Sequence, residues 1–351
     1  MNLQETRVRV STYRGSLRDC GQAYGEQHAE SIGITLGPEV KLRKGQWTYV
    51  ERCMGVPWRH KRALDDLIRG IAAGSGRSFL EIACLFFDGH GSLRNCTAVA
   101  ATRQGSMDGK PIIGMNWDGV VRAYPWSGLL RLDARGWPRM LVYASQPGQF
   151  PGAGINEHGM SLVWTTAARS LRRRFKWPRL GVPTYCLIAG ILACRDCREA
   201  LSLLKEAPNS DGFIFFLADA KGNAWVVEGI PHRIDYIECQ GAIGRANHLE
   251  SPDLVRLSGQ RVPPSTLANN TAARGKRIRQ LVRKHCGRID RSVVEAMLRD
   301  TVGKAGHTIC RNWSDGDACM TIDSFYLLPV QRQFWIARGL PTRHTFECHS
   351  A

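Results

Sequence analysis

The most informative part of the sequence is residues 95–118, which read NCTAVAATRQGSMDGKPIIGMNWD. Thr97–Thr102 is a short β-prone run, and Met107–Lys110 carries the Asp-Gly pair typical of a tight turn. Pro111–Trp117 is a second β-prone run. The pattern therefore predicts a β-hairpin, and the chain becomes strand-like at Cys96.

The chain before this hairpin is predicted to be mostly helical. Apolar residues recur at helical spacing within Trp58–Ala73, and the glycine-rich residues 74–76 end that helix. Phe79–Phe87 is a second helix candidate, because Ser78 precedes it as a capping residue. The change of character at Cys96 is abrupt.

The chain after the hairpin mixes further strands and helices. The strand candidates are Arg139–Ala144, Gly154–Ile155, Met160–Thr166, Phe213–Ala218, Ala224–Glu228, Ala242–Ala246, Cys319–Ile322 and Phe334–Ala337. The helix candidates are Thr184–Ala207, Ala272–His285 and Ser292–Arg299. Strands grouped in hairpins with helices between them favour an α+β layered sandwich over a parallel doubly wound sheet.

Composition bounds the class of protein. The 351 residues are 43% hydrophobic and 23% charged, which excludes a disordered chain. The longest apolar run, Tyr185–Cys194, is too short to span a bilayer. The first residues, MNLQETRVRV, show no basic segment followed by an apolar one, so we expect a soluble, cytoplasmic protein.

The chain is basic, with 48 Lys and Arg against 31 Asp and Glu and a net charge of +17, which favours acidic partners. One run without acids holds Arg169, Arg172, Arg173, Arg174, Lys176 and Arg179. It is interpreted as a solvated loop or as a clamp for a substrate phosphate or carboxylate, with Arg172 and Arg174 as candidate substrate-binding residues. Nucleic acid is an unlikely partner, because no recognition motif accompanies the run.

The twelve cysteines are expected to be reduced thiols, since no signal peptide is visible. Cys194 and Cys197 form a Cys-x-x-Cys pair without a second ligand pair, so no metal site is predicted. The phosphate-binding loop, zinc-protease and serine-hydrolase motifs are missing from the sequence. No cofactor is expected.

Six pieces in chain order resemble the acyl-coenzyme A:6-aminopenicillanic acid acyltransferase-like family of autoproteolytic N-terminal-nucleophile (Ntn) cysteine hydrolases. They are Arg14-Gly15 with residues 21–26, residues 71–82, the hairpin from Cys96-Thr97 to Asp118, Gly154–Met160 (GINEHGM), Ala246-Asn247-His248 and Ile309-Cys310-Arg311. The resemblance implies a four-layer αββα Ntn-hydrolase sandwich with a mostly helical N-terminal pro-segment.

The resemblance also implies a zymogen that cleaves itself between Asn95 and Cys96. Residues 1–95 would then be the pro-segment, or small α subunit, and residues 96–351 the catalytic β subunit, held together as an αβ heterodimer. Cleavage would free the α-amine of Cys96, whose ordinary pKa near 8 suits a general base. Nucleophile and base would then belong to one residue, so no separate catalytic His is required.

Further roles follow by resemblance. Asn247 would donate its amide to the oxyanion of the tetrahedral intermediate. Asp118 would accept a hydrogen bond from the α-ammonium or the thiol of Cys96. Arg311 would pair with a carboxylate, that of Asp118 or that of a substrate. Asn116 and Trp117 are candidate substrate-binding residues, although Asn116 also suits a supporting role within the hairpin.

Three positions depart from relatives in the family. Asn95 stands where many relatives carry Gly, and Ala98 lacks the hydroxyl that fungal acyltransferases carry. Met115 stands where bile-salt and penicillin V hydrolases carry Arg, which counts against those substrates.

The expected activity is acyl transfer from an N-acyl amide through a Cys96 thioester, with water as the preferred acceptor. The alternative is an acyl-CoA-dependent N-acyltransferase of the isopenicillin N acyltransferase type, with acyl-CoA as co-substrate. A more remote alternative is a non-catalytic basic binding protein. The sequence does not identify the substrate.

Overall fold

The fold comes from a computed structural model that describes residues 7–37, 44–87, 95–120, 126–167, 179–262, 270–312 and 319–351. Both Asn95 and Cys96 lie within these ranges. The basic run lies outside them except for Arg179, so the interpretation of Arg172 and Arg174 stays a prediction.

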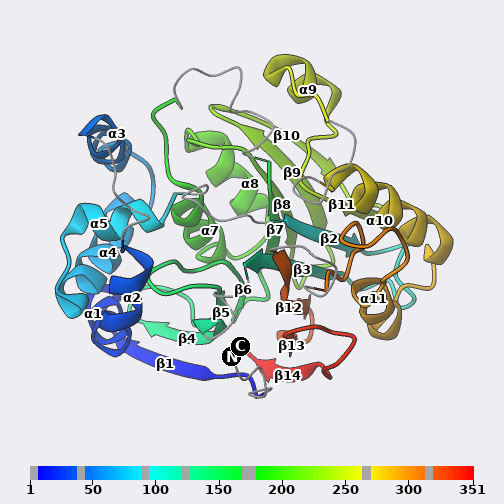
Figure 1. Cartoon of the computed structure of the whole chain (residues 1–351), viewed down its shortest axis with the longest axis horizontal. Helices are drawn as coiled ribbons and strands as arrows, with labels where there is room; N and C mark the ends of the chain where they lie inside the picture. Colours follow the sequence, from blue (N-terminus) through cyan, green and yellow to red (C-terminus); the bar gives the residue numbers. More distant parts are fainter. Residues whose placement is uncertain are drawn as a thin grey trace.

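Two β-sheets form the centre of the described part of the molecule (Figure 1). The larger sheet has eight strands in the spatial order β1 (Val10–Gly15), β4 (Gly128–Ala134), β5 (Met140–Ala144), β6 (Ala153–Asn156), β7 (Ser161–Thr166), β8 (Phe213–Ala218), β9 (Ala224–Ile230) and β10 (Arg233–Glu238). The smaller sheet has six, in the order β11 (Ala242–Arg245), β2 (Asn95–Ala101), β3 (Ile112–Val120), β12 (Cys319–Leu328), β13 (Gln333–Arg338) and β14 (Glu347–Ser350).

The described helices fall into two groups along the chain. The first group precedes the hairpin and contains α1 (Leu17–Gln27), α2 (Ala29–Thr35), α3 (Lys44–Met54), α4 (Lys61–Ser75) and α5 (Phe79–Leu85). The second group follows it and contains α7 (Thr184–Leu192), α8 (Cys197–Glu206), α9 (Pro252–Ser258), α10 (Thr271–His285) and α11 (Arg291–Leu298). Figure 1 shows the first group gathered at one end of the sheets and α10 with α11 at the opposite end.

The two sheets pack against each other, and helices cover their other faces. On β2, Ala98 joins the core shared with the larger sheet, whereas Val99 packs with Ile278 of α10 and Val294 of α11. Helix α7 contacts β6 and β7 of the larger sheet. Strands such as β2 and β8 are buried along their whole length because both of their faces are covered. This two-sheet arrangement confirms the predicted α+β class.

The hairpin predicted at the centre of the sequence is present as β2 and β3. The two strands are antiparallel, with Asn95 opposite Asp118, Cys96 opposite Trp117 and Thr97 opposite Asn116. Because side chains alternate between the two faces of a sheet, Cys96 and Trp117 point toward the larger sheet. Asp118 points the other way, toward the helices.

The N-terminal segment is mostly helical, as predicted, but it also contributes a strand that was not predicted. Strand β1 lies parallel to β4 at the edge of the larger sheet. Helices α1 and α4 approach closely at Gly21. A Cβ added there would lie only 2.3 Å from the carbonyl oxygen of Leu67, so the approach requires glycine. The Tyr24 hydroxyl is buried and accepts a hydrogen bond from the backbone N of Gly148 at 2.9 Å.

The single helix predicted over Thr184–Ala207 is wrong. The structure has two helices there, α7 and α8, separated by residues 193–196. Asn156 donates its amide to the carbonyls of Leu192 and Cys194 and so binds the end of α7. The Asp196 side chain accepts from the first backbone amides of α8 and caps it. Strands β4, β10 and β14 also lie outside the predicted set.

Candidate active site

Cys96 is the second residue of β2 and lies between the two sheets. It is 3% exposed and belongs to the core that the sheets share. Trp117 packs edge-on against Tyr143 of β5 and Trp164 of β7, with ring centroids 5.4 Å and 6.0 Å apart respectively. The predicted nucleophile therefore lies beside a buried aromatic group.

Asn247 follows β11 and connects the two sheets beside Cys96. Its Oδ1 accepts a hydrogen bond from the backbone N of Cys96 at 2.8 Å. Its Nδ2 donates to the backbone carbonyl of Thr166, the last residue of β7, at 3.1 Å. An amide nitrogen carries two hydrogens, so the bond to Thr166 uses half of its donor capacity. The structure thus brings the predicted oxyanion donor next to the predicted nucleophile.

Asp118 lies on β3 directly opposite Asn95, the residue before the predicted nucleophile. Its Oδ1 accepts a hydrogen bond from the Thr321 hydroxyl at 2.8 Å, and none of the described residues donates to its Oδ2. Burial raises the pKa of this carboxyl to about 6, and the positive charges of Arg311 and Arg274 oppose that rise. At neutral pH the group is mostly ionised.

Arg311 is fully buried near Asp118. Its backbone N donates to the hydroxyl of Thr321 at 3.0 Å, and its carbonyl accepts from the Thr321 backbone N at 2.9 Å. Thr321 therefore touches both residues. The guanidinium of Arg311 is the main influence that lowers the pKa of Asp118. The Asp118 Oδ2 receives no hydrogen bond from a described residue, so the pairing of these two side chains stays a prediction.

Arg274 is a site residue that the sequence analysis missed. It lies in the first turns of α10 and is fully buried, and its guanidinium donates to the Asn247 Oδ1 at 2.7 Å and to the Cys96 carbonyl. Burial lowers the pKa of Arg274 to about 10, so it stays charged at neutral pH. The missed signal is positional, since Arg274 shares the buried face of α10 with Ile278 and Leu281.

The first turn of α10 also holds the backbone of the Asn247 segment. The Thr271 hydroxyl oxygen accepts a hydrogen bond from the backbone N of Asn247 at 2.7 Å and lies 2.8 Å from Nδ1 of His248. Burial and the charge of Arg279 lower the pKa of His248 to about 4. His248 is therefore neutral at physiological pH and acts as a structural neighbour of Asn247.

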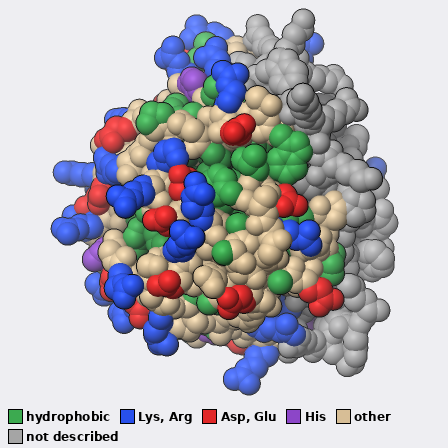
Figure 2. Space-filling view, turned by 90° about the vertical axis from the view of Figure 1, so that its left-hand side faces the viewer, with side chains coloured by type: hydrophobic (Ala, Val, Ile, Leu, Met, Phe, Trp, Pro, Cys, Tyr) green, Lys and Arg blue, Asp and Glu red, His purple; other side chains and the backbone are tan. Residues whose placement is uncertain are grey.

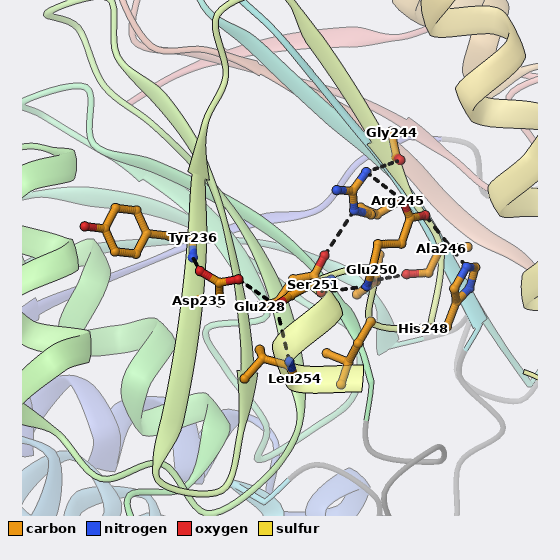
Figure 3. Close-up of polar contacts among 12 residues, drawn as sticks. Glu228, Asp235, Tyr236, Gly244, Arg245, Ala246, His248, Glu250, Ser251 and Leu254 are labelled. Atoms are coloured by element: carbon orange, nitrogen blue, oxygen red, sulfur yellow. Dashed lines mark hydrogen bonds and ion pairs between the residues drawn. The ribbon is translucent and has the colours of Figure 1, made fainter. Parts of the chain in front are cut away.

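A buried ion network stabilises the same segment from the other side. Figure 3 shows Arg245 between Glu228 of β9 and Glu250, with the chain of residues 246–248 beside them. The Arg245 guanidinium lies 3.1 Å from Glu228 and 3.2 Å from Glu250. The Glu228 carboxylate also accepts from the backbone N of Glu250 and of Ser251. Asn247 is thus placed by side chains from several strands and helices.

The remaining predicted residues lie as follows. Asn116 is fully buried, donates its amide to the carbonyls of Leu298 and Ile309, and accepts from the Ser324 hydroxyl. These contacts favour the supporting role for Asn116. Trp117 lies beside Cys96 on the face toward the larger sheet. Substrate binding by either residue stays a prediction.

Three further observations concern the described residues as a group. No cluster of His, Cys, Asp or Glu among them could hold a metal ion. None of their helices is long and apolar enough to cross a membrane. On the face that Figure 2 shows, Lys and Arg side chains are spread out with Asp and Glu between them, and they do not form one basic patch.

Residues 105–343 match the family model described as acyl-coenzyme A:6-aminopenicillanic acid acyl-transferase. The chain belongs to this family. The matched region contains Asp118, Asn247, Arg274 and Arg311 and begins after Cys96. The comparison with curated proteins gives no match.

Several solved structures match this chain at low sequence identity. A mutant of conjugated bile acid hydrolase from Clostridium perfringens is 11% identical over 73% of this chain and 97% of its own, with a TM-score of 0.42. The Caenorhabditis elegans ortholog of N-acylethanolamine-hydrolyzing acid amidase is 13% identical over 67% and 93%, with a TM-score of 0.45. Penicillin V acylase from Agrobacterium tumefaciens is 11% identical over 70% and 75%, with a TM-score of 0.37.

Proposed function

We propose that this protein is a self-cleaving Ntn cysteine amidohydrolase with an αββα sandwich, which acts on an N-acyl amide through a Cys96 thioester. The observation that carries the proposal is the 2.8 Å bond from the Cys96 backbone N to the Oδ1 of Asn247. In a cleaved chain this nitrogen is the α-amine, and Asp118 lies opposite Asn95 on the next strand. Family membership supports the reaction class.

The first reaction is cleavage of the bond between Asn95 and Cys96. The Cys96 sulfur attacks the carbonyl carbon of Asn95, the C–N bond breaks, and the nitrogen of Cys96 takes up the thiol proton. Water then hydrolyses the thioester and leaves a carboxylate on Asn95 and a free α-amine on Cys96. The products are residues 1–95 and 96–351.

Turnover uses the same thiol with the new amine as its base. The amine takes the proton of Cys96, the sulfur attacks the substrate carbonyl, and the departing amine takes the proton to leave an acyl thioester. Water then releases the acid. The second hydrogen on Asn247 Nδ2 is available to the oxyanion, a contact whose loss typically costs about 3 kcal/mol.

Asp118 is assigned to the α-ammonium rather than to the thiol. Strand alternation places the thiol on the face toward the larger sheet and the Asp118 carboxylate on the helix face, with the backbone nitrogen between them. The Oδ2 of Asp118, to which no described residue donates, can accept from that nitrogen.

The buried charges of this site favour an anion. Arg274 and Arg311 bring two positive charges against the single carboxylate of Asp118 among these three fully buried residues. Negative charge that develops on sulfur or on the substrate oxygen is stabilised by that excess. Arg311 either holds Asp118 in place or binds a substrate carboxylate.

Cleavage is expected to leave the two chains associated. Strand β1 forms part of the larger sheet beside β4, and the Tyr24 hydroxyl holds the loop at Gly148. Residues from α1, α4 and α5 belong to the same hydrophobic core as Cys96. The mature protein is therefore proposed to be an αβ heterodimer.

Its twelve free cysteines support action in a reducing compartment such as the cytoplasm.

The test is trapping of the acyl-enzyme with a panel of acyl amides and acyl-CoAs, read by denaturing mass spectrometry and product analysis. Wild-type protein is expected to carry the acyl group on the chain that starts at Cys96, whereas Cys96→Ala carries none. Cys239→Ala removes another buried thiol beside β2 and serves as the matched control with retained activity. Turnover that persists in Cys96→Ala would sink the proposal.

The products separate the two acyl-transfer activities. Free acid plus amine identifies a hydrolase. A new amide plus free CoA identifies the acyl-CoA-dependent transferase, the activity after which the family model is described.

A further inference from the structure

Arg274 contributes positive charge to the site, but the reaction just described makes no use of its hydrogen bonds. It is fully buried on the face of α10 that packs against the smaller sheet, together with Ile278, Leu281 and Val282. Removing a guanidinium from water is costly unless its hydrogen bonds are satisfied inside the protein. We therefore expect the buried guanidinium of Arg274 to have a specific role.

The hydrogen bonds of Arg274 all go to neutral acceptors around Cys96. Nε donates to the Asn270 Oδ1 at 2.7 Å, and Nη2 donates to the Asn247 Oδ1 at 2.7 Å. Nη1 donates to the Thr97 hydroxyl at 2.9 Å and to the carbonyl of Cys96. The planar fork of donors therefore connects the nucleophile strand, the N-terminus of α10 and Asn247.

This arrangement dictates which way the Asn247 amide faces. Its oxygen receives two donors, the Cys96 nitrogen and Nη2 of Arg274, and its nitrogen faces the Thr166 carbonyl. A flipped amide would set its N–H groups against both donors and its oxygen against that carbonyl. The amide orientation is thereby fixed with Nδ2 on the side of Thr166.

Of the two donors, Arg274 is the constant one. The Cys96 nitrogen becomes an amine after cleavage and gives up and takes up protons during each turnover, so it can also act as an acceptor. Arg274 has no acceptor capacity and stays protonated throughout. The contact that keeps the Asn247 amide from flipping during catalysis is therefore the one from Arg274.

We propose that Arg274 is a positioning residue that orients the Asn247 amide, so that Nδ2 is presented to the oxyanion during acyl transfer. This inference rests on the proposed function of Cys96 and Asn247. The family match covers this part of the chain.

The experiment is a double-mutant cycle on turnover of an acyl amide, with Arg274→Lys, Asn247→Ala and the double variant. Arg274→Lys keeps the charge and loses the fork of donors, so kcat is expected to fall about 10- to 100-fold with little change in KM. Asn247→Ala is expected to lower kcat about 100- to 1,000-fold. The double variant is expected to match Asn247→Ala alone, because Arg274 acts through Asn247.

Arg277→Lys is the matched control. Arg277 lies on the same helix but pairs with Asp300, at 2.6 Å and 3.0 Å, away from Cys96. Its kcat is expected to stay within about twofold of wild type, since Lys keeps the charge that pairs with Asp300 and neither residue contacts Cys96 or Asn247. If Arg274→Lys does not fold, Asn270→Ala removes the Nε acceptor and leaves Arg274 in place. Its smaller loss of kcat is also expected to vanish in the Asn247→Ala background.

Losses that multiply in the double variants would overturn the inference, because they would mean that Arg274 supports the structure independently of Asn247. Unchanged kcat in Arg274→Lys would overturn it as well. Both results would leave the Cys96 mechanism intact in an active wild-type protein. A wild-type protein without cleavage or acyl transfer would instead overturn the proposed function, and this inference with it.

Discussion

Two buried carboxylates lie on neighbouring strands of the smaller sheet, and they differ in their surroundings. Asp118 of β3 and Asp323 of β12 are both fully buried, and burial raises the pKa of each to about 6. Asp323 lies opposite Trp117 and therefore points toward the larger sheet, whereas Asp118 points toward α10 and α11.

Their hydrogen bonds separate the two. Asp323 is satisfied at both oxygens, by the Tyr143 hydroxyl at 2.6 Å and by the backbone N of Gly339 at 3.1 Å. Asp118 receives one donor, Thr321, and none of the described residues donates to its Oδ2. Burial and a raised pKa alone do not distinguish a catalytic carboxylate from a structural one. The distinguishing feature is a carboxylate oxygen that receives no hydrogen bond from a described residue and lies beside a reactive residue.

The largest expected effect is on turnover. Asp118→Asn replaces the charged acceptor for the Cys96 α-ammonium with a neutral amide, so kcat/KM is expected to fall about 100- to 10,000-fold. Asp323→Asn is expected to stay within about fivefold of wild type, since both oxygens of Asp323 already accept from Tyr143 and Gly339. Steady-state kinetics on the same acyl amide checks both. Equal losses of kcat/KM in the two variants would contradict the assignment of Asp118 as the catalytic carboxylate and Asp323 as the structural one.

The next effect is a gain in stability that both variants share. A carboxyl with a raised folded-state pKa stabilises the fold below pH 3.8, and this contribution is lost as pH rises through about 6. A rise from 3.8 to about 6 corresponds to roughly 3 kcal/mol at 1.36 kcal/mol per pKa unit. Asn mimics the neutral acid, so urea denaturation at pH 7.5 is expected to give up to that much extra stability. Destabilisation of both variants would contradict the assigned pKa values.

A smaller effect appears in the pH profile. Below about pH 6 Asp118 becomes protonated and ceases to hold the α-ammonium, which adds roughly a tenfold loss of kcat/KM for each pH unit. This additional slope is expected to persist in Asp323→Asn and to disappear in Asp118→Asn. The measurement is kcat/KM from pH 4.5 to 8.5 for wild type, Asp118→Asn and Asp323→Asn. An unchanged slope in Asp118→Asn would contradict the assignment of Asp118 to the α-ammonium.

The smallest effect concerns the structural carboxylate. Tyr143→Phe removes the hydroxyl that donates to Asp323, so the free energy of unfolding is expected to fall by about 1–2 kcal/mol. Turnover is expected to stay within about threefold of wild type. Thermal denaturation and a single-substrate assay test this, and a large loss of turnover at unchanged stability would give Tyr143 a role in the reaction.

Contiguous patterns in the sequence predict part of the fold and of the site. The hairpin around Cys96 was predictable because its two β-prone runs and the Asp-Gly turn between them are contiguous in the chain. Asn247 and Arg311 came from short motifs that resemble those of the family. Strand β1 was not predicted, because its partner β4 lies more than a hundred residues further along the chain.

Tertiary contacts explain the other differences. The break between α7 and α8 depends on the amide of Asn156, which comes from a distant turn. Arg274 is one of several basic residues on α10, and charge alone does not single it out. Its position on the buried face of the helix does, since Arg277 on the same helix pairs with Asp300 nearer the surface.

The proposed function requires Cys96 to become the N-terminal residue of a catalytic chain. The most direct test is an intact-mass spectrum of freshly purified wild-type protein beside Cys96→Ala. We expect two chains, residues 1–95 and 96–351, in the wild type and one uncleaved chain in the variant. A wild-type protein that remains a single chain of 351 residues after long incubation would contradict it.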